Sequence, residues 1–137
     1  MKPKIATRKK DIKRHQDIQL IYVRIKTTFN NTLLAITTPS GDVLFHTSAG
    51  VYGFKGPKKS TPYATKVITE KACEWLVSHK IKAFAIKVKG PHSYQESVFK
   101  TIAQYSRDTK YEYAVTSVSD VTPIAHNGCR ARKVKHN

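Results

Sequence analysis

Near the start of the chain, residues 18–28 alternate between two sets of side chains, which is the two-residue period of a β-strand. Residues 18–28 are rich in isoleucine, valine and tyrosine, and Ile21, Val23 and Ile25 share one face of the predicted strand. Residues 33–48 predict two more strands, one on each side of a Pro-Ser-Gly-Asp turn. The pattern therefore predicts an antiparallel meander of three strands.

Residues 49–62 contain three glycines and have no period, so they are predicted to form a loop that leads into a helix. Ser60 or Thr61 can cap that helix, and Pro62 suits its first turn because proline lacks the N–H that would be unpaired there. Apolar positions then recur at helical spacing as far as about His79. We expect these side chains to face the core: Ala64, Val67, Ile68, Ala72, Trp75 and Leu76.

The second half of the chain predicts a strand, a helix and a last strand. Residues 81–89 are apolar on both faces, which is typical of a central strand that is covered by helices. Residues 93–96, Ser-Tyr-Gln-Glu, have capping-box spacing and predict the start of a second helix. Residues 111–120 predict the last strand. The apolar stripe of the second helix consists of Val98, Phe99, Ile102, Ala103 and Tyr105.

The predicted order, β-β-β-α-β-α-β, indicates an α/β fold. It is typical of a single-domain α/β sandwich with a mixed sheet of about five strands. We expect the core domain to span residues 18–119. A basic N-terminal extension is predicted over residues 1–17, and a basic C-terminal tail over residues 120–137.

Charge sets this chain apart from an ordinary soluble domain. Its 137 residues include 25 Lys and Arg but only 9 Asp and Glu, which gives a formal net charge of +16. Seven of the Lys and Arg lie in residues 1–17, and four lie in residues 130–137, where no acid occurs. External anions relieve such self-repulsion, and basic domains most often bind nucleic acid. An anionic membrane surface is the alternative, but no apolar run reaches the roughly 18 residues of a membrane span, and no secretory signal follows the start.

The cysteines predict neither a disulfide framework nor a metal centre. Cys73 and Cys129 are far apart in the sequence, and neither belongs to a C-x-x-C pair. His126 and Cys129 have H-x-x-C spacing and His136 is nearby, but a zinc site would need further ligands. We therefore expect no metal, no cofactor and a reducing compartment.

Two stretches are candidate binding sites. Residues 49–62 combine glycines, which let the backbone approach a ligand, with lysines and a helix N-terminus, which favours phosphate. Their spacing does not match the phosphate-binding loop of nucleotide hydrolases, and a solvated flexible loop is the alternative. In residues 27–34, the amides of Asn30 and Asn31 beside Phe29 are suited to reading unpaired bases, with a bare hairpin turn as the equal alternative.

An enzyme would need converging carboxylates or a nucleophile beside its base. Glu70 and Glu74 alternate with Lys66 and Lys71, as on a solvated helix face. The acids considered are scattered along the chain: Asp42, Glu70, Glu74, Asp108 and Asp120. We therefore expect no catalytic activity.

Four stretches, in order, resemble one known family. FNNTLLAITTPSGDVL, SAGVYGFKGPKKSTPYAT, VKGP and DVTPIAHNGCR are similar to the small-subunit ribosomal protein S-eleven family, and the resemblance covers about residues 18–133. The H-N-G-C-R form of the tail resembles the bacterial and organellar branch. The resemblance implies a ribonuclease-H-like sheet without catalysis, and a place on the platform of the small ribosomal subunit near the messenger exit and the E site.

The resemblance also implies partners and RNA-facing residues. Ribosomal RNA and neighbouring platform proteins are the implied partners, with messenger RNA nearby and with no membrane and no small-molecule substrate. A free-standing RNA-binding protein is the alternative. The implied RNA-facing positions are Asn30, Asn31, Thr32, Lys55, Lys58, Lys59, Ser60, Thr61, Lys89, Gly90, His126, Asn127, Gly128, Arg130, Arg132 and Lys133.

The chain departs from the family pattern at two places. After residues 89–91 the family usually continues with a glycine-rich stretch and an arginine, where this chain has His-Ser-Tyr-Gln. Ala125 replaces a customary proline and residues 131–133 lack a proline pair, so the tail is expected to be less stiff. These departures, with the richness in Lys, Ile and Tyr, favour a mitochondrial ribosome, with the bacterial cytoplasm or a plastid as alternatives. Because residues 1–17 make a poor transit peptide, a mitochondrial chain is expected to be made inside the organelle.

The C-terminal tail is predicted to follow RNA. After a polar turn at residues 126–129 it carries only cations as charged groups, and it is expected to be disordered alone and to fold on RNA. Arginine bridges phosphate oxygens in pairs, whereas lysine acts as a point charge. Because Gly128 has no side chain, its backbone nitrogen can attack the amide of Asn127, which makes Asn127 a candidate for deamidation to isoaspartate.

Overall fold

The computed structural model describes residues 20–91 and 95–136, and its strands and helices follow the predicted order. The strands are β1 (Tyr22–Thr27), β2 (Thr32–Thr37), β3 (Val43–Ser48), β4 (Ala83–Lys89) and β5 (Ala114–Asp120). The helices are α2 (Pro62–Ser78) and α3 (Gln95–Thr109), with two short 3-10 helices, η1 (Ala49–Tyr52) and η2 (Gly56–Ser60). The predicted extension over residues 1–17 and the first half of the capping box at 93–96 lie outside the described residues.

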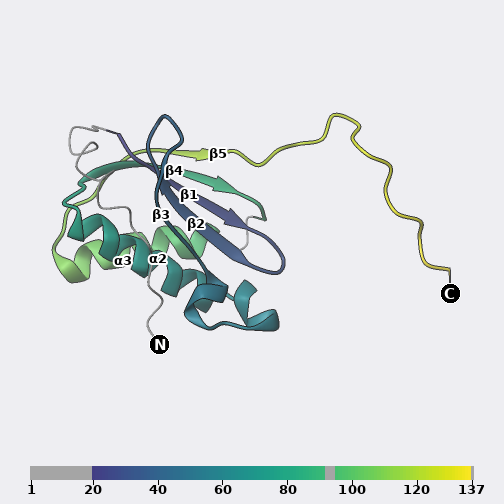
Figure 1. The fold of residues 1–137 in the computed structure, drawn as a ribbon, viewed down its shortest axis with the longest axis horizontal. Coiled ribbons are helices and arrows are strands. Elements are labelled where there is room, and N and C mark those ends of the chain that lie inside the picture. The colour runs from purple at the N-terminus through teal and green to yellow at the C-terminus, as the bar shows by residue number, and fades with distance from the viewer. Residues whose placement is uncertain (1–19, 92–94, 137) are drawn as a thin grey trace.

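The five strands form one mixed sheet in the order β3-β2-β1-β4-β5 (Figure 1). β1 pairs antiparallel with β2 and parallel with β4; β2 pairs antiparallel with β3, and β4 pairs parallel with β5. Four strands therefore run in one direction, and their carboxyl ends meet at the same edge of the sheet as the start of β2. We call this edge the carboxyl edge. The predicted mixed five-stranded sheet is confirmed.

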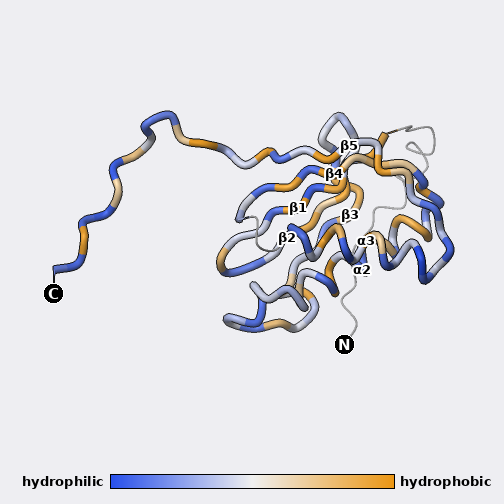
Figure 2. The backbone as a smooth tube through the Cα atoms, turned by 180° about the vertical axis from the view of Figure 1, so that it is seen from behind, coloured by the Kyte–Doolittle hydropathy of each residue, from blue (hydrophilic) through white to orange (hydrophobic). Residues whose placement is uncertain are grey.

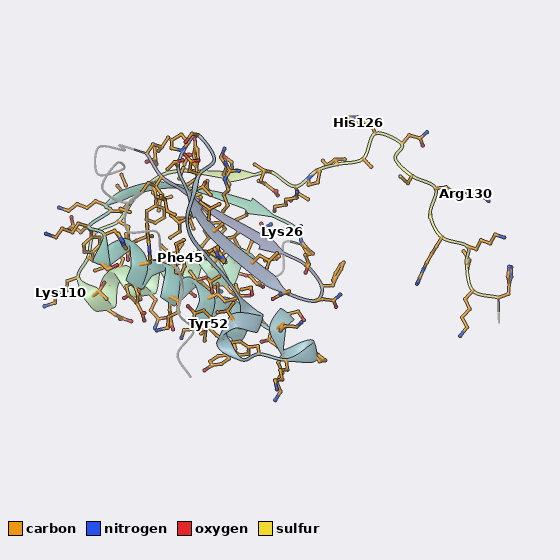
Figure 3. All side chains as sticks on the ribbon, viewed as in Figure 1. Lys26, Phe45, Tyr52, Lys110, His126 and Arg130 are labelled. Atoms are coloured by element: carbon orange, nitrogen blue, oxygen red, sulfur yellow. The ribbon has the colours of Figure 1, made fainter. Side chains whose placement is uncertain are left out.

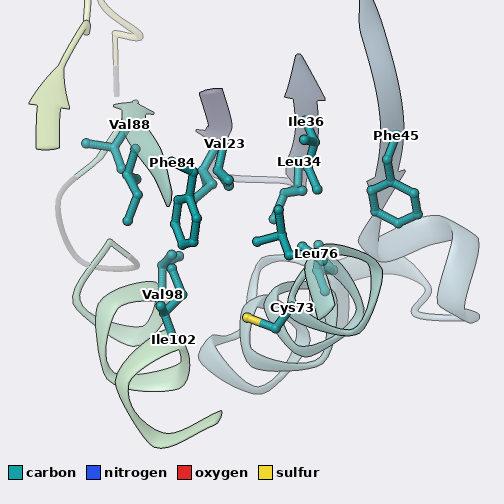
Figure 4. Close-up of a cluster of buried hydrophobic side chains, with 14 of the residues drawn as sticks. Val23, Leu34, Ile36, Phe45, Cys73, Leu76, Phe84, Val88, Val98 and Ile102 are labelled. Carbon is teal, nitrogen blue, oxygen red and sulfur yellow. The ribbon is translucent and has the colours of Figure 1, made fainter. Parts of the chain in front are cut away.

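Both helices cover the same face of the sheet, and the core lies between the two layers (Figures 1 and 4). The predicted inward face of β1 is confirmed, because Ile21, Val23 and Ile25 are all buried. In Figure 2 hydrophobic and hydrophilic positions alternate along the strands, as expected of a sheet with one covered face. Each fully buried aliphatic side chain stabilises the fold by about 1.5–3 kcal/mol. The buried hydrophobic side chains of the other elements include Leu34, Ile36, Phe45, Ile68, Leu76, Phe84, Ile86, Val98 and Ile102.

The expectation that helices cover both faces of the strand at 81–89 was wrong. β4 packs Phe84, Ile86 and Val88 against the helices, whereas Lys87 and Lys89 are half-exposed on the other face. The small alanines of this strand made both faces read as apolar, although they need no helix to cover them. The sheet therefore has one face without a helix.

α2 begins as predicted, because Thr61 is its N-cap and the Thr61 hydroxyl accepts a hydrogen bond of 3.3 Å from the Ala64 amide. Trp75 packs, as expected: its ring stacks on Phe45 at 5.8 Å and on His79 at 3.9 Å between ring centroids. In α3 the predicted stripe is too wide, because Ala103 is exposed.

The prediction that residues 49–62 form an irregular loop was partly wrong. η1 ends at Gly53, which has a φ of 82°, and the amides of Gly53 and Phe54 donate hydrogen bonds of 3.3 Å to the carbonyls of Gly50 and Ala49. A 3-10 helix of four or five residues is too short to show a hydrophobic period, so the sequence pattern did not predict η1 and η2. Ala49 is buried, so the segment is anchored to the core.

We expect Gly90→Ala to destabilise the chain strongly. Gly90 has a φ of 118°, and a Cβ atom there would lie 2.0 Å from the carbonyl oxygen of Thr27. Strain and overlap together should lower the free energy of unfolding by about 2–4 kcal/mol, measured by urea denaturation. The control is Gly41→Ala, at a φ of 102° with nothing within 4 Å of the added atom, which should cost less. Equal midpoints for the two variants would contradict the close approach of Gly90 to Thr27.

Candidate nucleic-acid interface

The carboxyl edge of the sheet brings together four segments that the sequence marks for RNA. The pairing of Thr27 with Thr32 closes the β1–β2 turn there, and the pairing of Lys26 with Lys89 puts the end of β4 beside it. Ser48 pairs with Leu33, so the segment that follows β3, with η1 and η2, leaves from the same edge. The C-terminal tail leaves from this edge as well, at the end of β5 (Figure 1).

Hydrogen bonds fix the β1–β2 turn and leave its tip exposed. The amide and the hydroxyl of Thr28 both donate to the Asn31 carbonyl, at 2.9 and 3.0 Å. The side-chain oxygen of Asn31 accepts from the Thr32 amide at 2.9 Å. Phe29 is 81% exposed and Asn30 is exposed, so an aromatic ring and an amide stand at the tip.

Thr32 differs from its neighbours in the predicted set. Its side chain is 2% exposed, and its hydroxyl lies 3.2 Å from the hydroxyl of Thr65 on α2. This buried hydrogen bond joins the start of β2 to the first turn of α2. The Thr32 side chain is therefore not accessible to a ligand, and we leave it out of the interface.

η2 presents lysines from an ordered segment. Lys55 and Lys58 are exposed and Lys59 is half-exposed. The Ser60 hydroxyl donates to the Pro57 carbonyl at 3.0 Å, and the Thr61 hydroxyl donates to the Lys58 carbonyl at 2.8 Å. Both hydroxyls therefore hold the turn that carries the lysines, and they do not point freely into solvent.

Gly90 lies at the junction of β1, β4 and the tail. Its amide donates to the Thr122 hydroxyl at 3.0 Å, and its carbonyl accepts from the side chain of Gln95 at 3.1 Å. The Thr27 hydroxyl donates to the Lys89 and Pro91 carbonyls at 3.4 and 3.3 Å. A glycine is needed at position 90 because a side chain there would overlap Thr27. The sequence did not indicate this structural role. The neighbouring Lys89 remains half-exposed.

The tail extends away from the body of the molecule, and residues 121–136 are exposed throughout (Figure 3). Asn127 and Gly128 have φ values of 68° and 48°, so the two residues form a left-handed bend. Figure 3 shows His126 and Arg130 on this extended segment, far from the core. Beyond Thr122, the side chains of residues 123–136 form no hydrogen bond or ion pair with the described part of the chain, which leaves the cations of the tail available to an external anion.

The positive charge at the carboxyl edge is not neutralised from within the described part of the chain. Ion pairs between described residues join Lys66 to Glu70, Lys71 to Glu74 and Lys100 to Glu96, all on the two helices. None of them involves a lysine or arginine of the carboxyl edge or the tail. Cations that lack a carboxylate partner are suited to binding phosphate.

Other kinds of site find little support in residues 20–91 and 95–136. Burial raises the pKa of the Cys73 thiol to about 12, so this thiol stays protonated and is a poor nucleophile and metal ligand. No group of three or more His, Cys, Asp or Glu side chains could hold a metal ion. No helix in these residues has the length and apolar character needed to cross a membrane.

Two features of the surface were missed by sequence reasoning. Phe29 was considered as a stacking residue but was not included in the predicted RNA-facing set, although it is the most exposed aromatic among the large exposed hydrophobics. Arg24, Lys26 and Lys87 lie on the sheet face that has no helix. The signal for the last three was present, because cations alternate with buried residues in β1 and β4.

Comparisons with known proteins identify a family of ribosomal proteins. The family model described as "Ribosomal protein S11" matches residues 22–136. The chain is also similar to the "Small ribosomal subunit protein uS11" of Orientia tsutsugamushi strains Boryong and Ikeda. It is 43% identical to each over 121 residues, which cover 88% of this chain and 91% of each relative. The chain therefore belongs to this family of ribosomal proteins, and it is a structural protein of the small ribosomal subunit rather than an enzyme.

Proposed function

We propose that this chain binds small-subunit ribosomal RNA through the carboxyl edge of its sheet and through its C-terminal tail. One observation carries the proposal: segments far apart in the sequence bring their exposed cations to a single edge. No ion pair between described residues neutralises those cations. RNA phosphates supply the missing counter-charge. A polyanion balances a net charge of +16 better than a single small anion does.

Different segments contact different parts of the RNA in this proposal. Phosphates are bound by Lys58 and Lys59 on η2, by Lys55 just before it and by Lys89 at the end of β4, which fixes the position of the body on the RNA. The tip of the β1–β2 turn reads an unpaired base, because Phe29 offers a ring to stack on and Asn30 offers an amide. The tail reaches further along the RNA, where its arginines contact phosphate oxygens in pairs. The tail residues proposed to contact RNA are His126, Asn127, Gly128, Arg130, Arg132 and Lys133.

We propose in addition that the chain sits on the platform of the subunit, near the messenger exit and the E site and beside other platform proteins. The four family-like stretches support this position, because three of them supply the carboxyl edge and the fourth supplies the tail. We propose a mitochondrial ribosome as its location. The departures from the family pattern after Gly90 and in the tail support that location.

Removal of residues 126–137 should leave the domain folded but weaken its retention on the subunit. The deletion takes away the four Lys and Arg of the tail, and its described residues, 126–136, are all exposed. In sucrose gradients of organelle and cytosolic lysates, the full chain should sediment with the organelle's small subunits, whereas the shortened chain should leave them in a high-salt wash. A plot of log affinity for the RNA against log salt concentration should also become less steep, with the magnitude of its slope lower by roughly 3, because four cations no longer contact phosphates.

Equal occupancy of the two chains after that wash would contradict the role of the tail. Sedimentation of the full chain apart from the subunits, with tight RNA binding in isolation, would favour a free-standing RNA-binding protein.

Phe29→Ala should weaken RNA binding and leave the fold intact. Loss of one base–aromatic stack costs about 1–3 kcal/mol of binding free energy, which corresponds to a fall of about 5-fold to 150-fold in affinity. The matched control is Val43→Ala, which removes an exposed hydrophobic side chain, 57% exposed, at the opposite edge of the sheet. Affinity is measured on a small-subunit rRNA fragment, with urea denaturation to check folding. Equal affinity of the two variants would show that Phe29 does not stack on RNA.

We propose that Asn127 deamidates to isoaspartate. Asn127 and Gly128 are both exposed, and Gly128 has no side chain to hinder its backbone nitrogen. That nitrogen attacks the side-chain carbonyl of Asn127 and expels ammonia, and water then opens the resulting succinimide to give isoaspartate. Peptide mass spectrometry of assembled subunits should find an isoaspartyl linkage at position 127, and Gly128→Ala should slow its formation because a side chain hinders the attacking nitrogen. Detection of unmodified Asn127 alone in assembled particles would end this proposal.

A further inference from the structure

The helix-free face of the sheet carries a compact block of four cations, of which the proposed RNA interface accounts for Lys89 alone. In the parallel register of β1 and β4, Arg24 lies opposite Lys87 and Lys26 lies opposite Lys89. We call these four residues the cationic face. They line a shallow depression of about 550 Å³.

The arrangement of charges on the cationic face is unfavourable in the isolated chain. Like charges directly opposite each other in a sheet repel, and here two such pairs lie side by side. No Asp or Glu lines the depression, and none of the four cations takes part in an ion pair with another described residue. The Nζ of Lys87 lies 4.1 Å from the centroid of the Tyr22 ring, which keeps this cation in place. The face is therefore arranged for an anionic partner.

The depression also has an aliphatic part, which distinguishes its partner from RNA. Leu33, Val51 and Val121 line it and are 40%, 41% and 44% exposed. No Phe, Tyr or Trp lines it, and His46 is the one ring among the lining residues, although single-stranded RNA is recognised on sheets mainly by stacking on aromatic rings. A ribose-phosphate backbone would leave the aliphatic surface uncovered. Aliphatic side chains of a polypeptide would bury it, which is favourable in water.

We propose that the cationic face docks an acidic polypeptide segment of a neighbouring protein in the small subunit. Carboxylates of the segment pair with Lys26 and Lys87, and its aliphatic side chains cover Leu33, Val51 and Val121. Side chains two residues apart in a strand are about 6.7 Å apart, so an extended segment with carboxylates at alternate positions matches the spacing of Arg24 and Lys26 along β1, or of Lys87 and Lys89 along β4. The inference rests on the chain's place in the small subunit, but it assigns this face to protein and the carboxyl edge to RNA.

Carbodiimide cross-linking of purified small subunits tests this assignment, because the reagent joins an amine only to a carboxylate in contact with it. Mass spectrometry should find Lys26 and Lys87 joined to Asp or Glu of another protein. Photo-cross-links from Lys26 or Lys87 to nucleotides would overturn the proposal in favour of RNA. Acylation of these two lysines in the subunit as fast as that of the exposed Lys82 would overturn it as well.

Charge reversal provides an independent test on the full chain. Lys26→Glu and Lys87→Glu place an acid opposite Lys89 and Arg24, so the isolated double variant should unfold at no lower urea concentration than the wild type. Its occupancy in subunits should fall several-fold below that of the matched control, Lys82→Glu with Lys110→Glu, which makes the same change in charge at two exposed lysines elsewhere. Exchange of the cross-linked partner carboxylates for lysine should restore occupancy.

Equal occupancy of the two double variants, or failure of the exchange to restore it, would overturn the proposal. Cross-links of Phe29 and of the tail to RNA are measured in the same subunits. Their absence would contradict the proposed RNA interface alone, without bearing on the cationic face.

Discussion

The pairing of β1 with its two neighbours is the constraint on which the rest of the structure depends. β1 lies in the middle of the sheet, antiparallel to β2 and parallel to β4, and its inward residues Ile21, Val23 and Ile25 are buried under the helices. A shift of one residue in this register would move those side chains to the helix-free face and bring Arg24 and Lys26 into the core. The register that buries the core thus also sets the position of the cations.

The same pairing separates two surfaces of different chemistry. At the carboxyl edge, the turn at 28–31, η2 and the tail offer cations, amides and an aromatic ring, which are the groups that bind RNA. On the helix-free face, four cations border aliphatic side chains, and the lining residues include no Phe, Tyr or Trp. One small domain can therefore contact RNA and protein at once, as a structural component of a ribonucleoprotein must.

Local patterns predicted the elements, whereas interactions between distant segments decided the rest. The period of residues 18–28 and the cap at Thr61 are local signals, and both were sufficient to place β1 and the start of α2. Thr32 was included with its RNA-facing neighbours because nothing in the sequence shows that its hydroxyl meets Thr65, 33 residues away. For the same reason the sequence did not reveal the close approach of Gly90 to Thr27. The helix-free face depends on where α3 packs, which a pattern in β4 alone does not determine.

The assignment of the carboxyl edge to RNA is tested most directly by a map of the small subunit that contains this chain, at a resolution that shows phosphates and side chains. Ribosomal RNA phosphates should lie within hydrogen-bonding distance of Lys55, Lys58 and the arginines of the tail, with a base stacked on Phe29. A map in which the β1–β2 turn, η2 and the tail face solvent or protein, while RNA contacts the chain elsewhere, would contradict it.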